Sequence, residues 1–169
     1  MTLSATLGPR VLQFVHKTLF MPRPVSLVQL SVDRPNIFIA ALPISKGDVG
    51  KRRDLDFVIP HGCRNPEDLV PTLVFIDDRM KVCGQVDTYV SRLDKSLWGS
   101  AVRLVSGYTN SISEGRRMKV IAGLRNQKLK MMVVTAGAAT GIDARHIQRV
   151  IQWCTPNIVD LANWWKRTD

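Results

Sequence analysis

The sequence predicts an α/β protein built on a mainly parallel β-sheet with helices on both faces. Apolar runs typical of strands alternate with segments whose apolar residues recur at helical spacing. The run 72–76 is apolar throughout, as expected of a strand covered on both faces. A second apolar run, 129–135, leads into a loop of small residues at 136–141. Such a loop lets a ligand approach the backbone closely, and in parallel sheets ligands bind at the carboxyl ends of the strands.

The first half of the chain is expected to be less regular than the second. Its predicted elements are a helix from Pro9 to Pro22, strands at 25–32 and 37–42, and a loop with one short helix at 46–71. The helix is predicted because the apolar residues at 11, 12, 15 and 19 share one face, and prolines stop it. Glycine, proline and charged residues punctuate 46–71, which favours a loop.

The second half alternates strands and helices more clearly. Strands are predicted at 72–76, 102–105, 129–135 and 150–151, and helices over 82–93, after 111 and after Asn157. Apolar residues from Val82 to Leu93 recur at spacings of four, four and three, which indicates one helical face. Ser111 and Glu114 have the spacing of a capping box. The apolar face of that helix is expected to comprise Met118, Ile121 and Leu124.

Composition excludes several classes of protein. At 169 residues and 45% hydrophobic, the chain is long enough to bury a core. No apolar run reaches ~18 residues, so no membrane span is expected, and no secretory signal is recognisable. Three scattered cysteines support neither a disulfide framework nor a zinc site. We therefore expect an intracellular protein without a metal of its own, nuclear if the source is eukaryotic.

The charge of the chain points to a polyanionic partner. Lys plus Arg number 24 against 14 for Asp plus Glu, which gives a net charge of +10. Such a surplus favours nucleic acid as a partner, although a basic surface can also serve solubility alone. Trp153, Trp164 and Trp165 could stack on bases, but their apolar surroundings favour a place in the core.

Four segments taken in order resemble the motif series of RecQ-type DNA helicases of superfamily 2. They are Leu3-Ser4-Ala5-Thr6, the segment 31–37, the segment 72–79, and Thr135-x5-Gly141-Ile142-Asp143 followed by Val150-Ile151. The resemblance implies a RecA-like three-layer sandwich with a mainly parallel sheet. It assigns residues 1–30 to the end of a first RecA-like lobe, and residues 33–169 to a second lobe truncated before the sixth motif.

The resemblance also implies roles for individual residues. Gly141, Ile142 and Asp143 would face ATP with Mg²⁺, which the complete motor binds between its lobes. Arg79, Thr135, Thr140 and Arg149 would lie near DNA, and Ser4, Ala5 and Thr6 would couple the lobes. Each also has a plainer interpretation. Asp143 could cap a turn, the threonines could satisfy loop amides, Arg79 could pair with Asp77 or Asp78, and Ser4 and Thr6 could suit a polar turn.

Departures from the family's pattern limit the activity expected of this chain. A phosphate-binding loop needs G-x-x-x-x-G-K-S/T, and Gly47-Asp48-Val49-Gly50-Lys51-Arg52 fails in both spacing and final residue. No Asp-Glu-x-His or similar acidic pair follows a strand to hold magnesium and a water. The arginines of the family's sixth motif are missing, and Arg167 is at best a remnant of them. The isolated chain is therefore not expected to hydrolyse ATP.

The resulting hypothesis is part of an ATP-dependent 3′-to-5′ DNA helicase of RecQ type, a class that acts in DNA repair and recombination. Its second lobe would close on ATP and track single-stranded DNA or a duplex junction, together with a first lobe. Two alternatives stay open. One is a non-catalytic module that binds single-stranded nucleic acid. The other is a small nucleotide-binding enzyme built around Gly137 and Gly141, although G-x-G-x-x-G is missing.

Overall fold

The chain divides into two compact units, residues 1–43 and residues 44–169. The structure is a computed structural model that describes residues 9–19, 36–38, 40–44, 52–76, 78–135, 138, 142 and 146–153. In the first unit, helix α1 (Pro9–Thr18) forms where the helical spacing of apolar residues predicted it. The strand predicted at 25–32 lies outside the described residues. The lobe boundary predicted between residues 30 and 33 stays a prediction.

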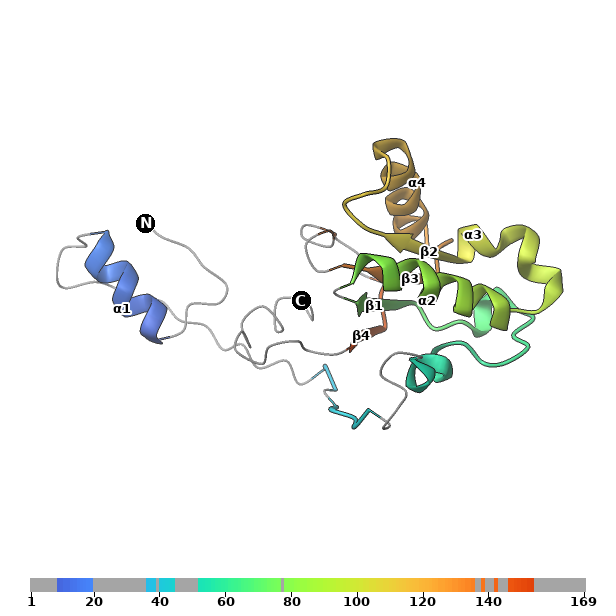
Figure 1. Cartoon of the computed structure of the whole chain (residues 1–169), viewed down its shortest axis with the longest axis horizontal. Helices are drawn as coiled ribbons and strands as arrows, with labels where there is room; N and C mark the ends of the chain where they lie inside the picture. The colour runs from blue at the N-terminus through green and yellow to red at the C-terminus, as the bar shows by residue number, and fades with distance from the viewer. Residues whose placement is uncertain are drawn as a thin grey trace. The chain divides into compact units, whose positions relative to one another are not determined.

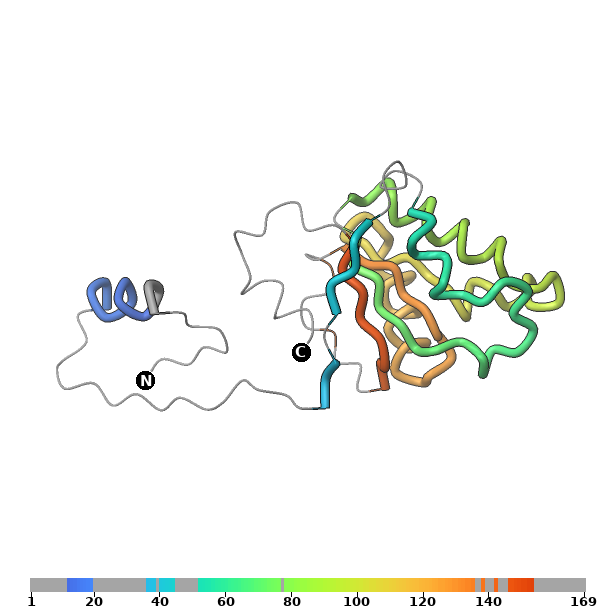
Figure 2. Tube along the Cα trace, turned by 90° about the horizontal axis from the view of Figure 1, so that it is seen from below, coloured from blue at the N-terminus to red at the C-terminus, as the bar shows by residue number. Residues whose placement is uncertain are grey.

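Among its described residues, the second unit holds a four-stranded sheet in which every pair of neighbouring strands is parallel. Its elements are η1 (Arg53–Val58), η2 (Pro66–Asp68), β1 (Thr72–Ile76), α2 (Arg79–Arg92), η3 (Lys95–Ser100), α3 (Ala101–Leu104), β2 (Val105–Tyr108), α4 (Glu114–Arg125), β3 (Met131–Val134) and β4 (Arg149–Trp153), shown in Figure 1. The strand order is β2-β3-β1-β4, and Figure 2 follows β4, in red, along one side of the sheet. The predicted α/β class with a parallel sheet is confirmed.

Alternation along the strands builds one core on each face of this sheet, because successive side chains of a strand point to opposite faces. The first core, here the α2 face, combines Val74, Ile76, Met131 and Val133 of the strands with Val82 and Tyr89 of α2. The second core, here the α4 face, combines Phe75, Met132 and Val134 with Val120 and Leu124 of α4. Helices α2 and α4 therefore cover opposite faces, as a sheet with right-handed crossovers requires.

The segment before β1 contributes more to the core than its composition suggested. A loop with one short helix was expected at 46–71, whereas the described part from residue 52 onward contains both η1 and η2. Four of its apolar side chains, Leu55, Val58, Ile59 and Leu69, are at most 2% exposed on the α2 face. Burial of these few side chains orders the segment despite its many charged residues.

Two boundaries in the middle of the chain differ from the prediction. A strand was expected at 102–105, but α3 occupies Ala101–Leu104 and β2 begins only at Val105, where pairing with β3 begins. Val102 is 70% exposed, so its β-branched side chain was a misleading signal. The run 37–42 was expected to be extended like a strand, but its described residues form none, and Phe38 is 92% exposed.

Helix α4 is not capped in the way its sequence suggested. The helix begins at Glu114 after Ser113, and no side-chain hydrogen bond caps it. The capping-box prediction for Ser111 and Glu114 is therefore wrong. Met118 was expected in the core but is 67% exposed, whereas Val120 is buried beside Leu124.

Among the described residues, no helix is both long enough and apolar enough to cross a membrane.

Candidate functional site

The carboxyl ends of all four strands lie at one edge of the sheet, here called the carboxyl edge. Because the strands are parallel and paired in register, Ile76, Tyr108, Val134 and Trp153 end them along this edge. Ligands of open parallel α/β sheets bind outside this edge. The loops that follow these strand ends are therefore the candidate ligand-binding loops.

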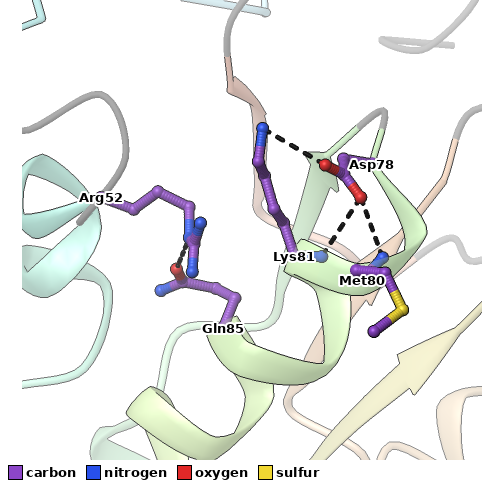
Figure 3. Close-up of polar contacts among 5 residues, drawn as sticks. All are labelled: Arg52, Asp78, Met80, Lys81 and Gln85. Atoms are coloured by element: carbon purple, nitrogen blue, oxygen red, sulfur yellow. Dashed lines mark hydrogen bonds and ion pairs between the residues drawn. The ribbon is translucent and has the colours of Figure 1, made fainter.

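The loop after β1 is organised by Asp78, which caps α2. Its carboxylate accepts hydrogen bonds from the backbone N–H groups of Met80 (2.9 Å) and Lys81 (3.4 Å), as Figure 3 shows. It also forms an ion pair with the Lys81 ammonium at 3.3 Å. The side-chain hydrogen bond from Lys81, with help from the two backbone N–H groups, holds the pKa of Asp78 below its ordinary value. Asp78 thus acts as the N-cap of α2.

Arg79, a residue predicted to lie near DNA, is exposed at the first position of α2. Its Nη1 donates a 2.9 Å hydrogen bond to Oγ of Ser111, in the loop between β2 and α4. Arg79 does not form the alternative ion pair with Asp78, whose carboxylate pairs with Lys81 instead. Asp77 lies outside the described residues. Arg79 therefore presents a fixed positive charge between two loops of the carboxyl edge.

The loop after β2 holds Ser111 in place through Thr109. The hydroxyl of Thr109 accepts a hydrogen bond from the backbone N–H of Ser111 (3.4 Å), and its carbonyl accepts one from Ile112 (3.3 Å). Thr109 is only 5% exposed, so it acts as an internal brace of the loop. Sequence reasoning missed Ser111 as a site residue, because its spacing from Glu114 matched a capping box. Its position just after a strand end was the signal that could have found it.

The loop after β3 begins at Thr135, another residue predicted to lie near DNA. The backbone N–H of Thr135 donates to the carbonyl of Tyr108 (3.3 Å), and its carbonyl accepts from Ala138 (3.0 Å). Thr135 is half-buried, Ala138 is buried, and Ile142 is half-buried against the α4 face. Thr135 and Ile142 therefore belong to the same edge of the sheet as Arg79.

Arg149 lies at the opposite, amino edge of the sheet. It begins β4 opposite Thr72, the first residue of β1, and its backbone N–H donates to the carbonyl of Pro71 at 3.1 Å. Its guanidinium carbon is 5.6 Å from the centroid of the Phe57 ring. The structure therefore does not bring Arg149 together with Arg79 and Thr135, although the resemblance grouped all three near DNA.

The remaining predicted site residues lie outside the described residues. They are Ser4, Ala5, Thr6, Thr140, Gly141, Asp143 and Arg167. Their roles stay predictions.

Close packing fixes the helix that carries Arg79. A Cβ placed on Gly107 of β2 would lie 3.1 Å from Cγ1 of Val82 and 3.5 Å from Cγ2 of Val86. Because the shorter distance is tighter than an ordinary contact, a side chain here would require Val82 to shift by a few tenths of an ångström. Glycine in β2 thus allows α2, and with it Arg79, to pack closely on the sheet.

Below the carboxyl edge, α2 carries a polar pair into the core. Gln85 is 1% exposed, and its Oε1 accepts a 2.7 Å hydrogen bond from Nε of Arg52; Figure 3 shows the two side chains pointing toward one another. Within the part of the chain that the structure describes, Nε2 of Gln85 and the hydroxyl of Tyr89 have no partner with hydrogen-bond geometry. Burial raises the pKa of Tyr89 well above its ordinary value, with Gln85 nearby opposing the rise only in part.

The described residues contain no group of histidine, cysteine, aspartate or glutamate side chains that could hold a metal ion. Of the three residues predicted to face ATP, only Ile142 is described, and its apolar side chain packs on the α4 face. Nothing among the described side chains therefore fits magnesium.

Comparisons with known proteins give similarity at the level of structure alone. No family model matches the sequence, and no curated protein matches it. The Mycobacterium smegmatis helicase Lhr, solved bound to ssDNA and AMP-PNP, is 22% identical, with a TM-score of 0.43, over 61% of this chain and 12% of that one. S. cerevisiae Dbp5, solved bound to RNA and ADP BeF3, is 15% identical, with a TM-score of 0.42, over 95% of this chain and 45% of that one. The chain thus spans less than half the length of either.

Proposed function

We propose that this chain is a second motor lobe of a nucleic-acid helicase of superfamily 2, of RecQ type, and that its carboxyl edge contacts single-stranded DNA. In the complete motor this lobe would work with a first RecA-like lobe in ATP-dependent 3′-to-5′ movement. The complete motor's activity, substrates and partners are part of the proposal.

One observation carries it. Two segments that resemble helicase motifs, 72–79 and 135–143, are separated by more than fifty residues, yet their described ends Arg79 and Thr135 lie at the same carboxyl edge. This coincidence is expected if both segments serve one ligand, and parallel sheets place their ligands at this edge.

The polar groups at this edge suit a phosphate backbone. The Arg79 guanidinium is exposed and oriented by Ser111, and guanidinium groups recognise phosphate through forked hydrogen bonds. The Thr135 hydroxyl would add a neutral donor of the kind that positions a strand without reading its bases. The net charge of +10 favours binding to any single strand and makes that binding dependent on salt.

The division of work between lobes follows from what the sequence contains. Because this chain has no G-x-x-x-x-G-K-S/T loop, the first lobe would bind the nucleotide phosphates. Gly141 and Asp143 are proposed to complete the nucleotide site from this side. A non-catalytic module for single-stranded nucleic acid is the second candidate, favoured by the basic charge together with the missing phosphate loop.

The first test measures binding of the full chain to labelled single-stranded DNA by fluorescence anisotropy across a salt series. Arg79→Glu is expected to weaken binding about tenfold and to lower the slope of log affinity against log salt by about one. Arg103→Glu is the matched control, because Arg103 is exposed and lies just before β2, the outer strand farthest from β4 in the described sheet. Equal losses in both variants would contradict the proposed site.

Two further measurements test the RecQ-type assignment and the division of work between the lobes. Preference for DNA over RNA of the same sequence supports the RecQ-type assignment, and preference for RNA contradicts it. A phosphate-release assay with the isolated chain and single-stranded DNA is expected to show no hydrolysis of ATP. DNA-stimulated release would overturn the division of work between lobes.

A further inference from the structure

The amino edge carries an exposed aromatic ring held against a cation. Phe57 of η1 is 57% exposed, and the guanidinium carbon of Arg149 lies 5.6 Å from its ring centroid. This distance is within the range of a cation–π interaction. The neighbours Leu55 and Val58 point into the α2 face, so η1 is anchored while Phe57 faces outward.

The charge next to this ring favours an anionic partner. Asp56, the residue before Phe57, forms an ion pair with Arg92 at 3.1 Å, and Nε of Arg92 also donates to the carbonyl of Ile59 at 3.1 Å. The carboxylate that precedes Phe57 in the sequence is thereby paired. The Arg149 guanidinium places a positive charge beside the ring.

We propose that Phe57 and Arg149 form a stacking platform for a base of the single strand that is bound at the carboxyl edge. The proposal rests on the proposed function, and it names a second contact for the same ligand. Single-stranded nucleic acid is commonly held by aromatic rings together with a positively charged groove, and arginine adds a cation–π contribution. The Arg149 guanidinium covers one face of the ring and would also attract the phosphate next to the stacked base.

The geometry of the sheet fixes the length of strand that the platform requires. Strand β4 runs from Arg149 at the amino edge to Trp153 at the carboxyl edge, and in the described sheet it is an outer strand. Its five residues span about 16 Å. A single strand can extend beyond the ~3.4 Å per nucleotide of a duplex strand, so a few nucleotides are enough to reach from one edge to the other. A dinucleotide, with a single phosphate link, is too short to occupy both places.

The test compares binding of a deoxythymidine dinucleotide and of a 12-mer of oligodeoxythymidine to the full chain. Phe57→Ala is expected to weaken binding of the 12-mer about 5- to 100-fold and to change binding of the dinucleotide less than twofold. Phe57→Trp is expected to restore affinity for the 12-mer, because it keeps a ring of sufficient size. Trp98→Ala is the control, since Trp98 is 51% exposed on η3 and is not paired with Arg149.

The outcomes divide cleanly between the two proposals. If Phe57→Ala binds the 12-mer as the wild type does, or if it weakens both lengths equally, the platform is wrong. Loss on Arg79→Glu would in that case still support the carboxyl edge as the binding site. If the wild-type chain binds neither oligonucleotide, both proposals fall. Thermal melting of Phe57→Ala close to that of the wild type shows that the fold is intact.

Discussion

The α2 face and the α4 face of the sheet are packed in different ways. The α2 face is closed by a helix together with the irregular segment from residue 52 onward, and it takes the polar side chains of Gln85 and Tyr89 into its interior. Among the described residues the α4 face is smaller, and the polar residue it buries is the small Ser106, which pairs with Met132. A face covered by one helix, such as the α4 face, can be predicted from the apolar periodicity of the sequence. A face that is also closed by a segment distant in the sequence, such as the α2 face, depends on contacts that no local pattern encodes.

The candidate site lies where the two faces meet. Arg79 belongs to the helix of the α2 face, whereas Ala138 and Ile142 pack on the α4 face. The hydrogen bond from Arg79 to Ser111 joins the two at the carboxyl edge. Substitutions within either core should therefore act mainly on stability, whereas Arg79→Glu should act on binding.

The largest effect on stability is expected from a cavity in the α4 face. Leu124 is fully buried, and Leu124→Ala is expected to lower the free energy of unfolding by ~2–5 kcal/mol, because a small core has few other contacts to compensate. Urea denaturation measures this change. Val102→Ala, at a position 70% exposed, should change the same quantity by less than ~0.5 kcal/mol. Similar values for the two variants would contradict the described core.

A smaller loss is expected where α2 meets β2. Gly107→Val places methyl groups where even a Cβ would lie 3.1 Å from Val82, so we expect a loss of ~1–3 kcal/mol in the free energy of unfolding. Gly115→Ala is the control, because a Cβ at Gly115 meets open space in helix α4. That variant should be stabilised by up to ~1 kcal/mol. A neutral Gly107→Val would show that α2 is not held closely against the sheet.

The polar interior of the α2 face predicts a change of the opposite sign. The hydroxyl of Tyr89 is buried without a partner of good hydrogen-bond geometry among the described groups, so Tyr89→Phe removes a desolvation cost that the nearby Gln85 offsets only in part. Thermal and urea denaturation should show stability unchanged or raised by up to ~1 kcal/mol. A clear loss of stability would mean that the hydroxyl is bonded to another group.

The smallest effect concerns the cap of α2 and depends on pH. The pKa of Asp78 is lowered in the folded chain by its hydrogen bond with Lys81, so its carboxylate stabilises the fold above its unfolded pKa of ~3.9. This contribution is lost as pH falls through the lowered folded pKa. The melting temperature of Asp78→Asn should therefore be slightly below that of the wild type at pH 7, and the difference should shrink at acid pH as the carboxyl group becomes protonated. A constant difference at all pH values would contradict the role of the charge.

Much of the sheet could be predicted from the sequence, because its signals are local. The apolar run 72–76 and the spacing from Val82 to Leu93 mark β1 and α2 correctly, since a buried strand and an amphipathic helix each require a particular periodicity. The prediction of a strand at 102–105 was wrong, because β-branched residues favour a strand assignment even where the chain is helical. Pairing with β3 decides where β2 begins, and that pairing is not visible in a short window.

The sequence by itself determined the α/β class, the parallel sheet and the carboxyl edge as the place of the loops, because alternation of strand and helix leaves few other arrangements. Only the tertiary structure decided which side chains contact one another at the edges of the sheet. Arg79 and Ser111 are 32 positions apart, and Arg149 stands at the far end of its strand beside Phe57. Side-chain pairs across such separations form only after the elements have packed, so no local pattern specifies them.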